Sequence, residues 1–122
     1  MIIAGFGFRR LAALDSLLDA YRQAAGTTQI DGIATIASKA SLRIFEELAA
    51  CLEQPIFAVD PVDLVIQKTQ SWSQKSVEKY NVGSVAEAVA LAASGEKSKL
   101  LTARVISSDR MVTCAVARGY CA

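Results

Sequence analysis

Gly5, Gly7, Arg9 and Arg10 fall within six residues, where an apolar N-terminal run gives way to a helical pattern. Glycine lets the backbone approach a ligand closely, and arginine binds carboxylates and phosphates. The unpaired N–H groups that open a helix also favour an anion. These residues therefore predict an anion-binding site at a strand-to-helix junction. Arg10 stands where a dinucleotide-binding fingerprint would have its third glycine, so the pair of glycines alone is weak evidence for a site. The alternative is a tight turn with two solvated arginines.

Ser38 and Lys39 follow the next apolar segment along the chain. If this segment is a strand parallel to the first, Lys39 adds a positive charge at the edge where Arg9 and Arg10 lie, which is where ligands gather in open α/β sheets. The alternative is that Ser38 caps a helix and Lys39 is solvated.

Gly83 and Ser84 stand at the start of a further helical segment and form the third candidate anion site. Ser84 and Glu87 have the spacing of a capping box, in which each side chain bonds the backbone N–H of the other. Capping alone explains both residues, although the same helix N-terminus could hold an anion if it faces the cleft.

Three arginines near the C-terminus, Arg104, Arg110 and Arg118, could also reach a ligand, but charges at strand ends are usually solvated. The acidic pairs Glu46-Glu47 and Asp60-x-x-Asp63 lack the spacing of a metal site or an acid–base pair. We therefore expect no bound metal and no cofactor.

Periodicity predicts which elements position these residues. Alternating or continuous apolar runs predict strands at 1–8, 30–37, 56–59, 99–106 and 111–118, and helical spacing predicts helices from Leu11 to near Gly26, over 42–52 and over 84–95. The initial strand–helix alternation indicates parallel pairing, and the turn 107–110 indicates a closing antiparallel hairpin. The expected fold is one three-layer α/β/α domain over residues 1–122, with a mixed sheet of about five strands.

The polar stretch 60–76 is predicted to be a loop leading into a short helix at 77–80. Trp72 either anchors this loop to the core or lines a ligand cleft.

Composition excludes several function classes. The 13 basic and 12 acidic residues give a net charge of +1, without the basic excess of a nucleic-acid-binding protein. The absence of histidine removes Ser-His-Asp and Cys-His catalysis within the chain. The cysteines 51, 114 and 121 show no paired spacing, which fits a reducing compartment. No signal peptide or membrane-spanning run is recognised, so we expect a cytoplasmic protein that contacts neither membrane nor nucleic acid.

Four blocks, in order, resemble the CobE/CbiG C-terminal family of cobalamin biosynthesis proteins. They are the turn from Ile3 to Arg10, the strand end from Ala34 to Lys39, the helix start from Val77 to Ala88, and the closing hairpin around 100–118. Phe8 departs from the family pattern, which usually has cysteine there, and argues against thiol chemistry at this turn.

The resemblance implies a role in building the corrin ring. Corrin precursors carry acetate and propionate groups, which suit Arg9, Arg10 and Lys39, while Phe6, Phe8 and Trp72 could supply apolar walls for the ring. We expect a protein that binds a precorrin or corrinoid intermediate. Two alternatives remain: a precorrin hydrolase or isomerase using Lys39, Glu87 or a bound water, and a non-catalytic partner of other cobalamin-biosynthesis enzymes.

Overall fold

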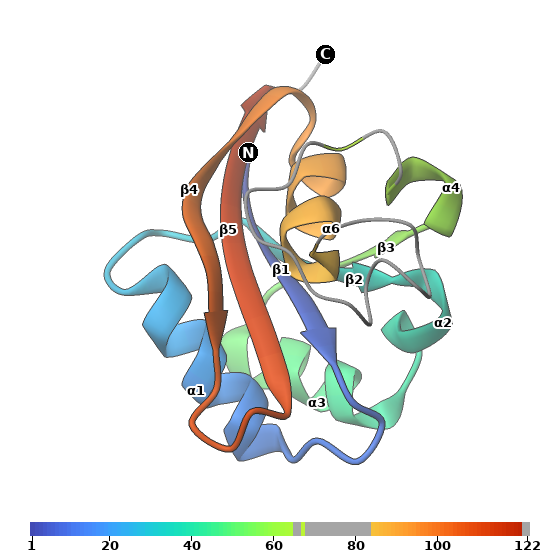
Figure 1. Cartoon of the computed structure of the whole chain (residues 1–122), viewed down its shortest axis with the longest axis vertical. Coiled ribbons are helices and arrows are strands. Elements are labelled where there is room, and N and C mark those ends of the chain that lie inside the picture. Colours follow the sequence, from blue (N-terminus) through green and yellow to red (C-terminus); the bar gives the residue numbers. More distant parts are fainter. Residues whose placement is uncertain (65–66, 68–83, 121–122) are drawn as a thin grey trace.

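Five strands form one mixed sheet in the order β3-β2-β1-β5-β4 (Figure 1). The structure, a computed structural model, describes residues 1–64, 67 and 84–120. The strands are β1 Ile2–Phe8, β2 Gly32–Ile36, β3 Ile56–Val59, β4 Glu96–Ile106 and β5 Val112–Tyr120. Strand β2 is parallel to both β1 and β3, whereas β5 is antiparallel to both β1 and β4. The expected mixed sheet with a C-terminal antiparallel hairpin is confirmed.

One face of the sheet is covered by α1 Leu14–Ala25 and α3 Arg43–Leu52. The aromatic side chains Phe6, Phe8 and Phe45 meet here, with ring centroids 5.7 Å apart in both the Phe6–Phe45 and the Phe8–Phe45 pair. All three are buried, so this layer holds the largest side chains of the core. Burial of such rings is the main source of stability in a domain of this size.

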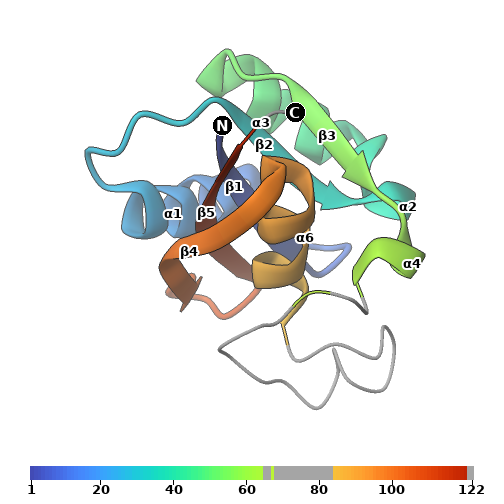
Figure 2. The same ribbon diagram turned by 90° about the horizontal axis from the view of Figure 1, so that it is seen from above.

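The opposite face is covered by α6 Val85–Ser94, which packs on β1 and β5. Figure 2 shows α1 and α6 on opposite sides of these two strands. The helix is rich in alanine and β1 carries glycine beneath it, so the two backbones approach closely. Two short helices, α2 Ala37–Ala40 and α4 Pro61–Leu64, complete the described elements. The predicted three-layer α/β/α fold is confirmed.

Two local predictions are wrong. The first helix begins at Leu14, not at Leu11, because residues 9–12 form a turn in which Ala12 N donates to Arg9 O at 2.9 Å. Leu11 is 89% exposed as a result and does not belong to the apolar face of the helix. The stretch expected to be a loop from residue 60 begins instead with α4, whose first residue is Pro61, a favourable first position for a helix. Trp72 and the helix expected at 77–80 lie outside the described residues.

The turn between β4 and β5 is bonded to α1 by a cluster we call the hairpin clamp: Ser16, Asp19, Ser107, Ser108 and Asp109. Both Ser16 Oγ and Ser107 Oγ donate to the Asp109 carboxylate, the latter at 2.6 Å. Ser108 N donates to Asp19 Oδ2 at 2.8 Å. These bonds lower the pKa of Asp109, chiefly through Ser107 and then Ser16, and the pKa of Asp19, chiefly through the Ser108 N–H.

We expect the hairpin clamp to make stability depend on acid pH. A carboxyl whose pKa is lower in the folded than in the unfolded state stabilises the fold above its ordinary pKa of 3.8, and this stabilisation is lost as the pH falls through the lower folded-state value. The free energy of unfolding, measured in urea, should therefore decline as the pH falls below the ordinary carboxyl pKa of 3.8, and less steeply in Asp109→Asn. Asp60→Asn, at an exposed carboxyl outside the clamp, is the control. Equal slopes in Asp109→Asn and wild type would contradict the prediction.

Within the part of the chain that the structure describes, every helix is too short or too polar to cross a lipid bilayer.

Candidate functional site

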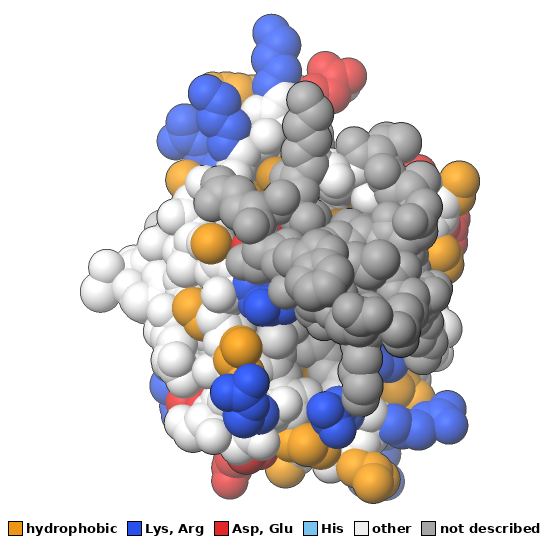
Figure 3. Space-filling view, in the orientation of Figure 1, with side chains coloured by type: hydrophobic (Ala, Val, Ile, Leu, Met, Phe, Trp, Pro, Cys, Tyr) orange, Lys and Arg blue, Asp and Glu red, His pale blue; other side chains and the backbone are white. Residues whose placement is uncertain are grey.

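The parallel strands β1, β2 and β3 end at one edge of the sheet, which we call the carboxyl edge. It carries Arg9 and Arg10, which follow β1, and Ser38 and Lys39, which lie in α2 directly after β2. The structure therefore brings the first two predicted segments to one edge. Figure 3 shows Lys and Arg side chains at the lower part of the molecule, where β1 ends in Figure 1.

Lys39 is held in place at the end of β1. Its Nζ donates to Phe8 O and lies 5.2 Å from the centroid of the Phe8 ring, within the range of a cation–π interaction. The side chain is half-buried. This contact joins the ends of β1 and β2 and fixes a positive charge next to Arg9, so the alternative of a freely solvated lysine does not describe it.

Arg9 and Arg10 are exposed, and Arg9 N donates to Met111 O at 3.0 Å, which fixes the backbone of the turn against β5. Ser38 is also exposed, and no side-chain bond caps α2, whose N-cap residue is Ile36. The capping alternative for Ser38 is therefore wrong. Both arginine side chains are exposed, so they lie at the surface of the carboxyl edge.

Gly5 and Gly7 lie beneath α6. A Cβ atom on Gly5 would stand 2.3 Å from Ala86 O and 2.6 Å from Ala90 N, so close helix packing accounts for this glycine. A Cβ on Gly7 would stand 2.9 Å from Thr113 Oγ1 and 3.7 Å from Ala86 N, in the first turn of α6. Thr113 Oγ1 donates to Gly7 O at 3.1 Å. Gly7 therefore lies near the carboxyl end of β1 and beneath the first turn of α6.

Ser84 is the buried N-cap of α6, and its Oγ accepts from Glu87 N at 3.3 Å. This is one half of the predicted capping box. The Glu87 side chain reaches the other way: it is fully buried, and its Oε2 accepts from Arg104 N in β4 at 2.8 Å. The sequence spacing identified the cap but not this bond. Gly83 lies outside the described residues.

The expectation that Phe6 and Phe8 form apolar walls for a ligand is wrong. Phe6 is fully buried and Phe8 is 5% exposed, and both pack with Phe45 under α3. Side chains alternate between the two faces of a strand, so these rings lie on the face away from α6, whereas Gly5 and Gly7 occupy positions on the face that α6 covers. Cys114 is fully buried on the same side of the sheet as these rings, and burial raises the pKa of its thiol.

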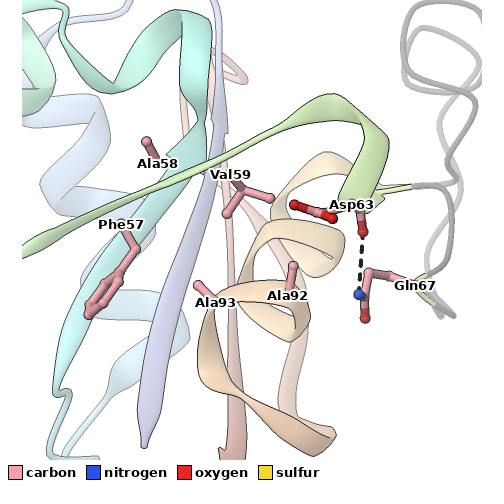
Figure 4. Close-up of a pocket in the computed structure, with 7 residues that line it drawn as sticks. All are labelled: Phe57, Ala58, Val59, Asp63, Gln67, Ala92 and Ala93. Carbon is pink, nitrogen blue, oxygen red and sulfur yellow. Dashed lines mark hydrogen bonds between the residues drawn. The ribbon is translucent and has the colours of Figure 1, made fainter.

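A pocket of about 370 Å³ lies between β3, α4 and α6, and sequence reasoning missed it. Figure 4 shows the ring of Phe57 and the small side chains of Ala92 and Ala93 facing this space. Asp63 supplies a carboxylate, and Gln67 Nε2 donates to Asp63 O at 3.3 Å. None of the predicted site residues that the structure describes lines this pocket. A sequence signal for it is the run of alanines in α6, whose small side chains leave space beside β3.

Among residues 1–64, 67 and 84–120, no group of three or more Cys, Asp or Glu side chains is placed to hold a metal ion. The carboxyl edge carries the Lys39 ammonium and the two arginines, near the first turn of α6, and Asp60 follows β3 at the same edge. Ammonium, guanidinium and helix N-terminal N–H groups can bind carboxylates.

Comparison with known protein families decides the identity. The family described as "Cobalamin synthesis G C-terminus" matches residues 2–117. The chain belongs to this family. Since the match runs from the start of β1 into β5, it includes every element that builds the carboxyl edge. The resemblance recognised in the sequence is confirmed, and the chain is a member of a cobalamin biosynthesis protein family.

Solved structures agree with the cobalamin synthesis G C-terminus assignment. CobE, described as a protein from the cobalamin (vitamin B12) biosynthetic pathway, is 29% identical with a TM-score of 0.85, over 98% of this chain and 91% of that chain. The cobalamin biosynthesis protein ChiG from Agrobacterium tumefaciens str. C58 is 27% identical with a TM-score of 0.74, over 99% and 100%.

A cobalamin biosynthesis protein G homolog from Sulfolobus solfataricus shares the fold, at 23% identity and a TM-score of 0.69, over 95% of this chain and 36% of that chain. A search of curated protein sequences gave no match.

Proposed function

We propose that this chain, acting as a single domain, binds a corrinoid intermediate of cobalamin biosynthesis at the carboxyl edge of its sheet. The observation that carries the proposal is the placement of Lys39, whose ammonium group is bonded to Phe8 O immediately before Arg9 and Arg10. Family membership and the pathway of CobE supply the class of ligand.

The chemistry of the ligand fits these residues. A corrin precursor carries several acetate and propionate groups around its ring, and each carboxylate is bound well by a charge-assisted hydrogen bond. The fixed Lys39 side chain loses little further freedom on binding, while the exposed arginines can adjust to the spacing of the carboxylates. Membership of the pathway also makes its enzymes candidate partners.

The enzymatic alternative would use Lys39, Glu87 or a bound water. The Lys39 ammonium donates to Phe8 O, and the Glu87 carboxylate accepts from Arg104 N of β4, so both side chains make backbone hydrogen bonds that hold them in place. We therefore propose binding as the function.

An absorbance and fluorescence titration with hydrogenobyrinic acid tests this function. We expect saturable binding in wild type, and an affinity about tenfold lower in Lys39→Ala and in the double variant Arg9→Ala/Arg10→Ala, because each loses charge-assisted bonds to carboxylates. Arg22→Ala removes an exposed arginine from the last turn of α1 and should bind as wild type does. Absence of binding in wild type, or unchanged affinity when all three cations are removed, would refute the proposal.

A further inference from the structure

The buried Glu87 carboxylate lies against an irregular stretch of β4. Register fixes Thr102 opposite Val116 and Val105 opposite Cys114 in β5. Two residues of β4, Ala103 and Arg104, therefore stand against the single residue Ala115. This is a β-bulge, in which the extra residue loses its partner in the ladder of backbone hydrogen bonds.

Glu87 supplies the partner that the bulge lacks. Arg104 N donates to Glu87 Oε2 at 2.8 Å, and Glu87 itself is fully buried in the first turn of α6. Figure 2 shows β4 passing beside this helix. A buried carboxylate destabilises the fold unless it is hydrogen-bonded, so the bond from Arg104 N stabilises the buried Glu87 side chain as well as the bulge.

The bulge places Arg104 on the face of the sheet that α6 covers. Ala115 stands opposite Gly5 in β1, and Gly5 faces Ala86 and Ala90 of α6. Val105, the next residue of β4, packs with the core under α1, and successive side chains of a strand point to opposite faces, so Arg104 lies on the α6 face. Since β5 is antiparallel to both β1 and β4, the end of β4 lies at the same edge of the sheet as the end of β1. Arg104 is two residues from the end of β4, at Ile106, and is half-buried beside the first turn of α6.

We propose that Glu87 is a positioning residue, whose carboxylate holds the β4 bulge so that Arg104 becomes a further carboxylate-binding side chain of the site. This inference rests on the function proposed above and extends it by one named cation and the residue that orients it. It also explains why the third position of α6 is a glutamate, since Ser84 Oγ already caps the helix and the Glu87 carboxylate reaches toward β4.

A double-mutant cycle tests the inference. Hydrogenobyrinic acid is titrated into wild type, Arg104→Ala, Glu87→Ala, Glu87→Gln and the double variant Glu87→Ala/Arg104→Ala, after circular dichroism has shown that each is folded. We expect affinity to fall about tenfold in Arg104→Ala and to fall also in Glu87→Ala. If Glu87 acts through Arg104, the Glu87→Ala change should have no further effect once Arg104 is absent. Glu87→Gln keeps an oxygen acceptor and should retain most of the affinity.

Lys99→Ala is the matched control, because Lys99 is an exposed cation of the same strand, five residues before Arg104. It should bind as wild type does. Wild-type affinity in Arg104→Ala, or an equal loss from Glu87→Ala with and without Arg104, would overturn the inference while leaving the proposed function standing.

A measurement without ligand separates the two proposals. Amide hydrogen exchange at Arg104 should speed up in Glu87→Ala and stay near the wild-type rate in Glu87→Gln, because only the first variant removes the acceptor. If wild type fails to bind the corrinoid, the proposed function and the binding role of Arg104 fall together, and this exchange rate still decides whether Glu87 holds the bulge. An unchanged rate in Glu87→Ala would overturn that part as well.

Discussion

Replacement of Phe45 by alanine is expected to lower the free energy of unfolding by about 4 kcal/mol, the largest effect of any substitution considered for this chain. Phe45 is fully buried in α3, and its ring packs edge-on against Phe6 and stacks with Phe8, with centroids 5.7 Å apart in each pair. Alanine would remove the ring from between the sheet and the helix. The cost has two parts: the lost burial of apolar surface, and the cavity left in a layer that cannot fully collapse.

Urea unfolding followed by circular dichroism measures this effect. Phe45→Leu is the control, since it keeps most of the buried volume and should cost about 1.5 kcal/mol or less. A loss below about 1.5 kcal/mol in Phe45→Ala would show that this layer rearranges freely around the missing ring. The substitution also bears on the candidate site, because Phe45 supports the Phe8 ring and the Lys39 ammonium lies over that ring.

Gly5→Ala is expected to destabilise the protein by about 3 kcal/mol, although it adds a single methyl group. The new Cβ would stand 2.3 Å from Ala86 O, 2.6 Å from Ala90 N and 2.8 Å from Ala90 Cβ. Two of these three atoms belong to the backbone of α6, so no change of side-chain rotamer can relieve the contact. The helix must move away from β1, and the first turn that carries Ser84 and Glu87 must move with it.

Gly7→Ala is the matched comparison for this prediction. Its Cβ would meet Thr113 Oγ1 at 2.9 Å, while the nearest atoms of α6 stand at 3.5 Å and beyond. The closest atom is a side-chain hydroxyl that can rotate, so the loss in unfolding free energy should be clearly smaller than that of Gly5→Ala. Similar losses at the two positions would contradict the view that the α6 backbone sets the requirement at Gly5.

Local pattern predicted most of the fold because each element carries its own signal. Apolar runs bounded by turn residues marked all five strands, and helical spacing marked the helices that pack on both faces. The Leu11 prediction failed because that residue continues the helical spacing of α1 while its backbone belongs to a preceding turn. Periodicity locates the face of an element more reliably than it locates the ends.

The hairpin clamp could not be predicted, because its bonds join distant residues. Ser16 and Asp109, which are 93 positions apart, meet only after α1 has packed against the final hairpin. No local spacing distinguishes this aspartate from any other turn residue.

The sequence by itself determined the order of the main strands and helices, the resemblance to a cobalamin biosynthesis family, and the expectation that Lys39 lies at the sheet edge of Arg9 and Arg10. These follow from short-range patterns and from the rule that parallel strands end at one edge. Only the tertiary structure decided that Phe6 and Phe8 face the core and that Gly5 allows α6 to pack closely on β1. It also decided that the Glu87 carboxylate accepts a hydrogen bond from β4. The physical reason is that the direction of a side chain and the distance between a helix and a strand depend on how the layers pack. An irregular strand register such as the β4 bulge leaves no trace in the spacing of residues.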